Sequence, residues 1–367
     1  MSAKHLVKEV AAALMDRLGL LRRLGDPRQP LVLYFHHVSP PGRLRHYIAD
    51  LTVSAATFEC QISFLRDRFN VIPLEAVVHR LADGTGPSGR DLAITFDDGY
   101  LDNYTWAYPI LKKHGVPATI FIATAHVGSS RPFWWQTLAS LLEWAGAAGV
   151  DFERLPPDLF PAPLAGLLRR ALRDPMALTG VTNYLKSLGT SPRCRILAAL
   201  EEHIRPDSSQ RRLPRLFLSW HEMKEMTDHG ITFGSHSHTH PVLTELSDEE
   251  LSRELTVSRA LIQDHLGLEA SAFSYPDGWA DARVRTHVIG AGYKYAVQTG
   301  REFSSGSLDV YAIPRRMVKE AHARSRFGEF SGSLFAAELA GVFDRLFLRH
   351  RRARNPYRAR HAPEVSA

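Results

Sequence analysis

The sequence predicts an α/β fold, either a barrel or a doubly wound sheet, within a chain of 367 residues. Short apolar runs that end in polar residues or glycine are typical of buried strands, and helical patterns lie between many of them. This alternation continues from residue 31 to residue 313, which favours parallel strands connected by helices. A content of 44% hydrophobic and 23% charged residues is ordinary for a globular protein with a sizeable core.

The expected elements follow from these patterns in chain order. An amphipathic helix within 4–25 has apolar residues at spacings of three and four, with basic residues elsewhere around it. The helix expected at 57–69 carries an apolar face, the one at 102–115 ends in Lys-Lys-His and glycine, and the one at 247–267 begins with serine and three acids. The expected strands are 31–35, 70–73, 92–96, 118–123, 231–234, 271–275, 293–297 and 310–313.

One long stretch interrupts this alternation. Residues 131–216 contain helical patterns and no clear strand, which predicts a helical insertion in the α/β body. The sequence therefore divides into an N-terminal amphipathic helix at 1–29, a barrel domain with its insertion at 30–330, and a C-terminal helix with a basic tail at 331–367.

The positive charge is concentrated in that tail. The chain has 45 basic and 39 acidic residues, a net charge of +6, and residues 345–367 alone hold seven Arg and one acid. The rest of the chain is therefore balanced, and a nucleic-acid-binding body is not expected.

The cysteines and the N-terminus favour a reducing compartment. The two cysteines, Cys60 and Cys194, form no motif, and the longest apolar run near the N-terminus, 10–15, is too short for a signal peptide. We therefore expect a cytoplasmic protein. The N-terminal helix either packs on the domain or lies on the anionic inner face of the membrane, helped by the arginine tail.

Acids and histidines follow two of the expected strands. Asp97 and Asp98 come directly after the run at 92–96, and His236, His238 and His240 come directly after the run at 231–234. In α/β barrels the carboxyl ends of the strands carry the active site. If 236–240 forms a helical turn, the spacing of four puts His236 and His240 on one face. One carboxylate and two imidazoles would make an open metal site, and the second carboxylate would remain free as a general base.

These stretches resemble the polysaccharide deacetylase (NodB-homology) family of carbohydrate esterases. Its Thr-Phe-Asp-Asp-Gly motif appears at 95–99, and its His-Ser/Thr-x-x-His motif appears at 236–240, followed by proline. The resemblance covers roughly 30–130 and 217–320. It implies a distorted (β/α) barrel of about seven strands and removal of the N-acetyl group of an amino sugar.

The resemblance also implies roles for the four residues. Asp97 would be the catalytic base. Asp98, His236 and His240 would bind a divalent metal, usually zinc, with cobalt, nickel or manganese as alternatives.

The third motif of the family departs from its usual form. Where the family has Arg-Pro-Pro-Tyr-Gly, this chain has Ser274, Tyr275, Pro276, Asp277 and glycine, so the arginine that orients the base is missing. We expect Tyr275, Pro276 and Asp277 to line the substrate site, with the Asp277 N–H as oxyanion donor.

Two further residues are expected to complete the machinery. The segment Ile-Pro-Arg-Arg offers Arg315 as a replacement for the missing cation. The stretch at 31–40 resembles the Tyr-His-x-Val start of a permuted subgroup, which implies that His36 is the general acid; the alternative is that it only caps a strand.

Trp135 stands near the start of the insertion and can either stack on a sugar ring or belong to a core. The expected substrate is a polysaccharide or a lipid-linked glycan precursor in exopolysaccharide or cell-envelope synthesis. The alternatives are a metal-dependent amidase acting on a small molecule or another acyl group, and a catalytically silent carbohydrate-binding protein.

Overall fold

The computed structural model describes residues 3–21, 30–40, 51–83, 90–152, 155–174, 177–204, 214–300 and 309–343. Its centre is a closed barrel of seven parallel strands, in which β5 pairs with β1 and completes the ring. The predicted barrel is therefore confirmed, and the doubly wound alternative is wrong. In order around the barrel the strands are β1 (Leu31–Phe35), β10 (Ile313–Met317), β9 (Tyr295–Thr299), β8 (Ala272–Ser274), β7 (Ile231–Ser235), β6 (Ala118–Ile122) and β5 (Asp91–Phe96).

Three short strands lie outside the ring. β4 (Asn70–Val71) pairs with β5 next to the closure, while β2 (His37–Ser39) and β3 (Thr52–Ser54) form a parallel pair of their own. Most expected strands are found within two residues of their predicted bounds. The strand expected at 310–313 is wrong, because β10 begins at Ile313 and continues through two arginines. Hydropathy does not identify such a strand, since the charge of a buried arginine is compensated by residues far away in the sequence.

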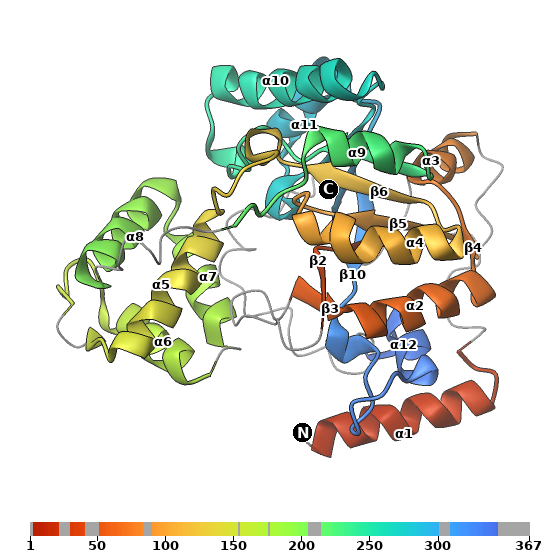
Figure 1. Cartoon of the computed structure of the whole chain (residues 1–367), viewed down its shortest axis with the longest axis horizontal. Helices are drawn as coiled ribbons and strands as arrows, with labels where there is room; N and C mark the ends of the chain where they lie inside the picture. Colours follow the sequence, from red (N-terminus) through yellow and green to blue (C-terminus); the bar gives the residue numbers. More distant parts are fainter. Residues whose placement is uncertain are drawn as a thin grey trace, which may run out of the picture.

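Helices cover the outside of the barrel (Figure 1). Serine side chains begin several of them: Ser247 Oγ accepts the N–H of Glu250 at the start of the helix expected at 247–267. The helix expected at 102–115 is divided, because Asn103–Ala107 is a π-helical turn before the α-helix begins. The outer helices are α2 (Ala55–Arg68), α3 (Leu74–Ala82), α4 (Tyr108–His114), α9 (Trp220–Thr227), α10 (Asp248–Leu266) and α11 (Ala282–Gly290).

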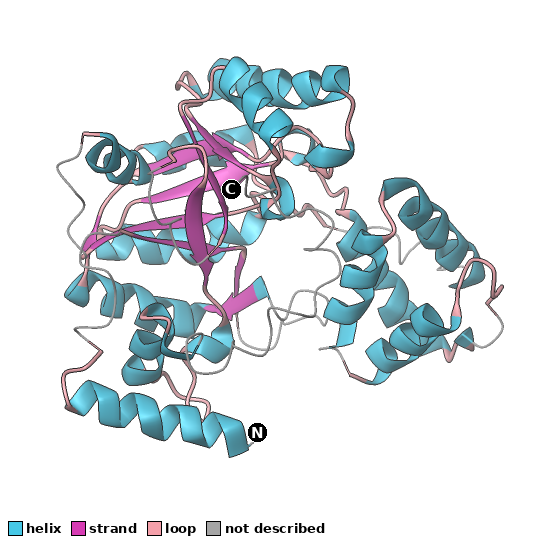
Figure 2. Cartoon of the chain, turned by 180° about the vertical axis from the view of Figure 1, so that it is seen from behind, coloured by secondary structure: helices cyan, strands magenta, loops and turns pink. Residues whose placement is uncertain are grey.

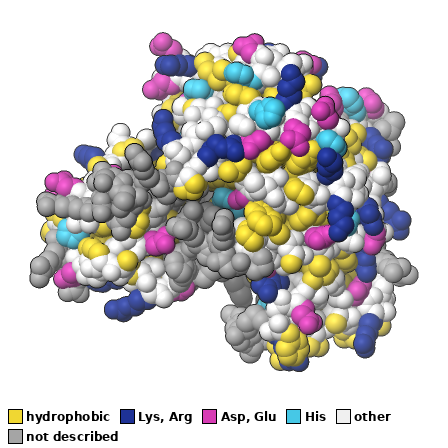
Figure 3. Space-filling model, in the orientation of Figure 1, with side chains coloured by type: hydrophobic (Ala, Val, Ile, Leu, Met, Phe, Trp, Pro, Cys, Tyr) yellow, Lys and Arg dark blue, Asp and Glu magenta, His cyan; other side chains and the backbone are white. Residues whose placement is uncertain are grey.

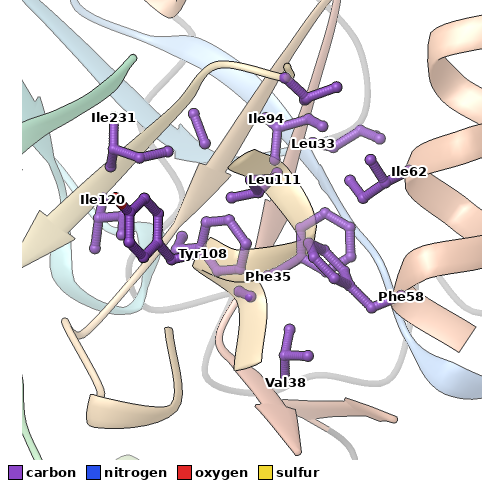
Figure 4. Packing of buried hydrophobic residues seen from close by; sticks show 14 of the residues in the cluster. Leu33, Phe35, Val38, Phe58, Ile62, Ile94, Tyr108, Leu111, Ile120 and Ile231 are labelled. Atoms are coloured by element: carbon purple, nitrogen blue, oxygen red, sulfur yellow. The ribbon is translucent and has the colours of Figure 1, made fainter. Parts of the chain in front are cut away.

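The main core lies between the barrel strands and the helices α2 and α4 (Figure 4). The rings of Phe35, Phe58 and Phe96 pack with centroids 5.2 to 5.9 Å apart. Each such buried ring stabilises the fold by roughly 1.5–3 kcal/mol. This packing fixes the strand ends that carry the acidic residues, because Phe96 directly precedes Asp97.

Four helices follow β6 and precede β7, within the insertion expected at about 131–216. They stand beside the barrel as a group without strands (Figure 2). Their facing sides form a separate apolar core that includes Leu142, Leu164, Leu185 and Leu200. The four helices are α5 (Trp134–Ala148), α6 (Ala162–Arg173), α7 (Leu178–Ser187) and α8 (Thr190–Ile204).

The N-terminal helix α1 (Ala3–Arg17) packs on α12 (Gly332–Leu339) through a small cluster that includes Ala12, Leu334 and Phe343. The basic tail of the sequence, 345–367, lies outside the described residues. Among the helices that are described, none combines the length and the apolar character needed to cross a membrane.

Candidate active site

The acidic pair and the histidines lie at the carboxyl ends of two barrel strands. Asp97 and Asp98 follow β5, and His236 follows β7. A single strand, β6, lies between these two and pairs with both. The backbone N–H of Asp97 donates to the carbonyl of Phe35 at 3.0 Å, and that of His236 donates to the carbonyl of Ile122 at 2.9 Å. The ladder hydrogen bonds therefore continue to the first residue of each loop and hold it rigidly.

The loops are built from left-handed backbone. In the described parts of the chain, the non-glycine residues with positive φ are Asp98 (75°), Ser237 (65°), His240 (59°) and Asp277 (58°). Such conformations are costly for residues with a side chain and concentrate at functional sites. Residues 236–240 do not form the helical turn that would put His236 and His240 on one face. The two imidazoles are instead brought together by left-handed residues in an irregular loop.

Asp98, His236 and His240 form a compact group of potential ligands. Asp98 Oδ1 lies 3.6 Å from His236 Nε2 and 3.5 Å from His240 Nε2, and the three ligand atoms lie within 4.8 Å of one another. The second ring nitrogen of His236, Nδ1, donates to the Ser274 carbonyl at 2.7 Å, which leaves Nε2 as the nitrogen for a metal. This donor set fits a divalent metal with open positions.

The electrostatics of the group also fit a cation. Burial and then the neighbouring Asp97 carboxylate raise the pKa of Asp98 well above its usual range. Burial lowers the pKa of His236, and it lowers that of His240 to about 3, so both rings are neutral, as metal ligands must be. A divalent cation would offset the repulsion between the two adjacent carboxylates.

Asp97 is bound by a buried arginine. Arg315 Nη1 and Nη2 each donate to one oxygen of the Asp97 carboxylate at 2.7 Å, and Nη2 also donates to Ser274 Oγ at 2.8 Å. Burial alone would raise the pKa of Asp97, but Arg315 and then His236 lower it well below its usual range. The guanidinium lies over the ring of Tyr34, 4.7 Å from its centroid. The arginine absent from the third motif thus has a spatial counterpart on β10, next to the serine that stands in its place.

His36 lies at the end of β1 and lines the same cavity as the acidic pair. Burial lowers its pKa to about 3, while the Asp97 carboxylate acts in the opposite direction. Its backbone carbonyl accepts from the amide of Asn103 at 2.8 Å, so the π-helical turn holds the end of the strand. The next residue has a different environment, because His37 Nδ1 donates to Asp102 at 2.5 Å and its ring stacks on Tyr100.

The third motif forms a tight turn at the end of β8. Tyr275 is buried and its hydroxyl donates to the Tyr311 carbonyl at 3.0 Å. Pro276 is buried as well, and Asp277 occupies the left-handed position that follows it. Gly278 has φ of 74°, and a Cβ there would lie 1.8 Å from Thr299 Oγ1, so only glycine fits.

A cavity of about 290 Å³ connects these groups. Trp135 lines it, stacks on Phe133 at 4.4 Å and lies 5.0 Å from His240, so it is a cavity wall and also packs on other aromatic rings. The sequence reasoning missed the contribution of α7, whose Asn183 and Lys186 reach the cavity. Neither residue belongs to a recognisable sequence motif, and the two reach the cavity only because the insertion folds against the barrel.

The family model for polysaccharide deacetylase matches residues 84–296, more than half of the chain. The chain belongs to the polysaccharide deacetylase family. It is a hydrolase that acts on carbon–nitrogen bonds other than peptide bonds. The resemblance based on two motifs is thereby confirmed, whereas the roles of the individual site residues remain predictions.

Individual relatives of this polysaccharide deacetylase support the same assignment. The YxkH protein of Bacillus subtilis (strain 168) is 23% identical over 310 residues, which is 84% of this chain and 78% of YxkH. A poly-beta-1,6-N-acetyl-D-glucosamine N-deacetylase of Staphylococcus aureus is 35% identical over 108 residues, but the match covers 27% of this chain and 37% of that enzyme.

Solved structures show the same fold. The Streptococcus pyogenes deacetylase PplD in complex with acetate has a TM-score of 0.53 at 19% identity, covering 81% of this chain and 95% of PplD. IcaB from Ammonifex degensii has a TM-score of 0.52 at 18% identity, covering 85% of this chain and 97% of IcaB.

Proposed function

We propose that this polysaccharide deacetylase is a metal-dependent enzyme that hydrolyses the N-acetyl group of an amino sugar in a polysaccharide or lipid-linked glycan. The observation that carries the proposal is the constellation at one mouth of the barrel. The potential metal ligands Asp98, His236 and His240 form a compact group. Beside this group lies the Asp97 carboxylate, which accepts two hydrogen bonds from the buried Arg315. A named relative acts on poly-beta-1,6-N-acetyl-D-glucosamine, which supports this class of substrate.

In this mechanism Asp98, His236 and His240 hold a divalent metal, with zinc as the first candidate and cobalt, nickel or manganese as alternatives. When bound, the metal polarises the acetyl carbonyl and makes water a better nucleophile. Asp97 accepts a proton from the attacking water, and Arg315 keeps that carboxylate ionised and oriented. The N–H of Asp277 donates to the developing oxyanion. The products are acetate and a free amine.

The leaving nitrogen needs a proton, and His36 is the proposed donor. Because burial lowers the pKa of His36 to about 3, its ring is neutral before the reaction. We infer that it receives the proton that Asp97 took from the attacking water and passes it to the nitrogen as the carbon–nitrogen bond breaks. The proton balance then closes within the site.

The first test compares apo and metal-loaded protein. We expect chelation to abolish acetate release from N-acetylglucosamine oligomers and one equivalent of zinc or cobalt to restore it. Acetate is measured beside formate and ammonia. Release of either of these instead would favour an amidase with another substrate, and oligomer binding without any turnover would favour a silent carbohydrate-binding protein.

The outer face of α1 supports a peripheral contact with the cytoplasmic face of the membrane. Val7, Val10, Leu14 and Leu18 are 59%, 59%, 58% and 64% exposed, and they form one apolar stripe that points away from the protein. Figure 3 shows some hydrophobic atoms at the bottom of the molecule, where α1 lies in Figure 1. The sequence segment with seven arginines follows Phe343, which packs on the inner side of α1. Apolar residues beside many cations are suited to an anionic lipid surface.

The membrane contact predicts a defined loss of vesicle binding. Replacing both Val10 and Leu14 by Glu should reduce binding to vesicles with anionic lipid by roughly tenfold or more, since each aliphatic side chain contributes about 1.5 kcal/mol on burial. Co-sedimentation at low and high salt measures this, because screening weakens the electrostatic part. Ile289→Glu, at an exposed site on α11, is the control and should bind like the wild type. Equal binding of the α1 variant would rule out this surface.

A further inference from the structure

The insertion presents a polar stripe to the reaction centre. On α7, Val181 and Leu185 pack into the core of the insertion. The opposite side, Thr179, Thr182, Asn183 and Lys186, lines the catalytic cavity. These positions follow the helical spacing of three, four and seven, so they form a single face. The apolar face of α7 packs in the core of the insertion, and its polar face points toward the cavity. The polar face is therefore positioned to bind a ligand.

Two residues of this face also border a second cavity. This cavity, of about 440 Å³, lies against β10 and the segment after it, and Asn183 and Lys186 line it as they line the first. Asp277 and Thr299 of the barrel are shared in the same way. Each cavity alone reaches about the size of a typical ligand site. The two cavities are therefore neighbours that share a border made by α7 and the barrel, and a ligand longer than one unit can contact this border.

The shared border is held in place by an ion pair. Lys186 Nζ donates to the carboxylate of Asp277, the residue at the left-handed position of the third-motif turn. Burial would raise the pKa of Asp277, but Lys186 and then His240 lower it below its usual value. The Lys186 ammonium also lies 5.9 Å from the ring centroid of Trp279. The insertion is thus tied to the barrel at the point where the two cavities meet.

Asn183 is the residue of this face with unused hydrogen-bonding capacity. It is exposed to both cavities, and within the described part of the chain its side chain makes no hydrogen bond. A carboxamide offers donors and an acceptor together, which matches the hydroxyl groups of a sugar ring. Thr182 directly precedes Asn183, Thr179 lies one turn before it, and both line the catalytic cavity.

We propose that α7 of the insertion binds the sugar unit next to the one that loses its acetyl group, with Asn183 as the hydrogen-bonding residue and Lys186 as the positioning residue that fixes the helix. This rests on the proposed deacetylase function and deepens it. The substrate is then a glycan of at least two units, and the insertion makes the enzyme prefer it over a free monosaccharide.

The test compares chain lengths in the zinc-loaded full-length enzyme. For Asn183→Ala, the ratio of kcat/KM on a β-1,6-linked N-acetylglucosamine tetramer to that on the monosaccharide should fall about five- to tenfold, as expected for the loss of one or two hydrogen bonds in a site. The change should lie in KM. Arg195→Ala, an exposed residue of α8 that lines neither cavity, is the matched control and should keep the wild-type ratio.

A binding measurement separates this proposal from the function on which it rests. In an Asp97→Asn background, calorimetry should show the tetramer bound about five- to tenfold more weakly when Asn183 is also replaced by Ala. An unchanged tetramer-to-monosaccharide ratio together with unchanged tetramer affinity would overturn the role of α7 and leave the deacetylase function intact. No acetate from any oligomer with the metal-loaded wild type would overturn the proposed function, and the α7 proposal with it.

Discussion

Asp98→Ala should lose both its metal and its acetate release, while Asp97→Asn should keep the metal and lose turnover. Asp98 supplies the carboxylate of the ligand group, at 3.6 and 3.5 Å from the two imidazole nitrogens, and without it two neutral histidines remain. Asp97 touches Arg315 and lies outside that group. We expect turnover to fall by about a thousandfold or more in both variants, since general-base catalysis alone contributes roughly a hundred- to ten-thousandfold. Metal content by elemental analysis distinguishes them.

The thermal stability of the apo protein gives an independent test of Asp98 as a metal ligand. Asp98 is a buried carboxylate beside a second one, and both burial and Asp97 raise its pKa. Removing it relieves this cost, so Asp98→Ala should melt at the same or a higher temperature than the wild type in chelator. Zinc should raise Tm in the wild type and leave the variant unchanged, because only a ligand that binds the native state stabilises it. Bound zinc and acetate release retained in Asp98→Ala would contradict the assignment.

Arg315→Met should cost both stability and catalysis. The guanidinium is fully buried and makes two hydrogen bonds with the Asp97 carboxylate, so its removal leaves a buried charge without its partner. Breaking such a pair from one side costs about 3–5 kcal/mol. The pKa of Asp97 should then rise, because Arg315 is the strongest of the neighbours that lower it against the effect of burial. The carboxylate also loses the two hydrogen bonds that orient it, so we expect kcat to fall by about a hundredfold or more.

An ion pair at the other end of β5 provides the control. There Arg80 of α3, whose side chain is 42% exposed, donates to the buried Asp91 at 2.6 Å, at the end of the strand opposite Asp97. Arg80→Met should lower the free energy of unfolding but leave kcat per folded molecule unchanged. Urea denaturation and pH–rate profiles measure the two effects. If Arg315→Met keeps the kcat and pH profile of the wild type, Arg315 does not support the base.

The barrel could be predicted because its strands are apolar runs bounded by turn residues. β1 was located residue for residue, and β5 within one residue. The predicted position of β10 was wrong by several residues, because the strand contains the buried Arg315. The guanidinium of Arg315 donates to Asp97 and Ser274, which lie 218 and 41 residues away in the sequence. The packing of α1, with its apolar stripe outward, was also inaccessible to sequence reasoning, since periodicity defines a face but not its direction.

The ligand residues of the candidate site could be chosen from motifs, but their geometry could not. The left-handed conformations of Asp98, Ser237 and His240 contradict local preferences, so the spacing of the two histidines does not predict the loop that brings them together. Asn183 and Lys186 stand on a helix with no motif at all. They become neighbours of the barrel only when the insertion folds over it.

The closure of the ring by β1 between β10 and β5 has a consequence for biosynthesis. Asp97, Asp98 and both imidazoles are synthesised before Arg315, and the strand that carries Arg315 is the last of the barrel to leave the ribosome. Pairing the first strand with the last is a contact of very high sequence separation, which is the slowest kind to form. A nascent chain can therefore bring the proposed metal ligands together while the proposed base, Asp97, still lacks its partner Arg315. We expect activity only after β10 has been synthesised and has paired with β1.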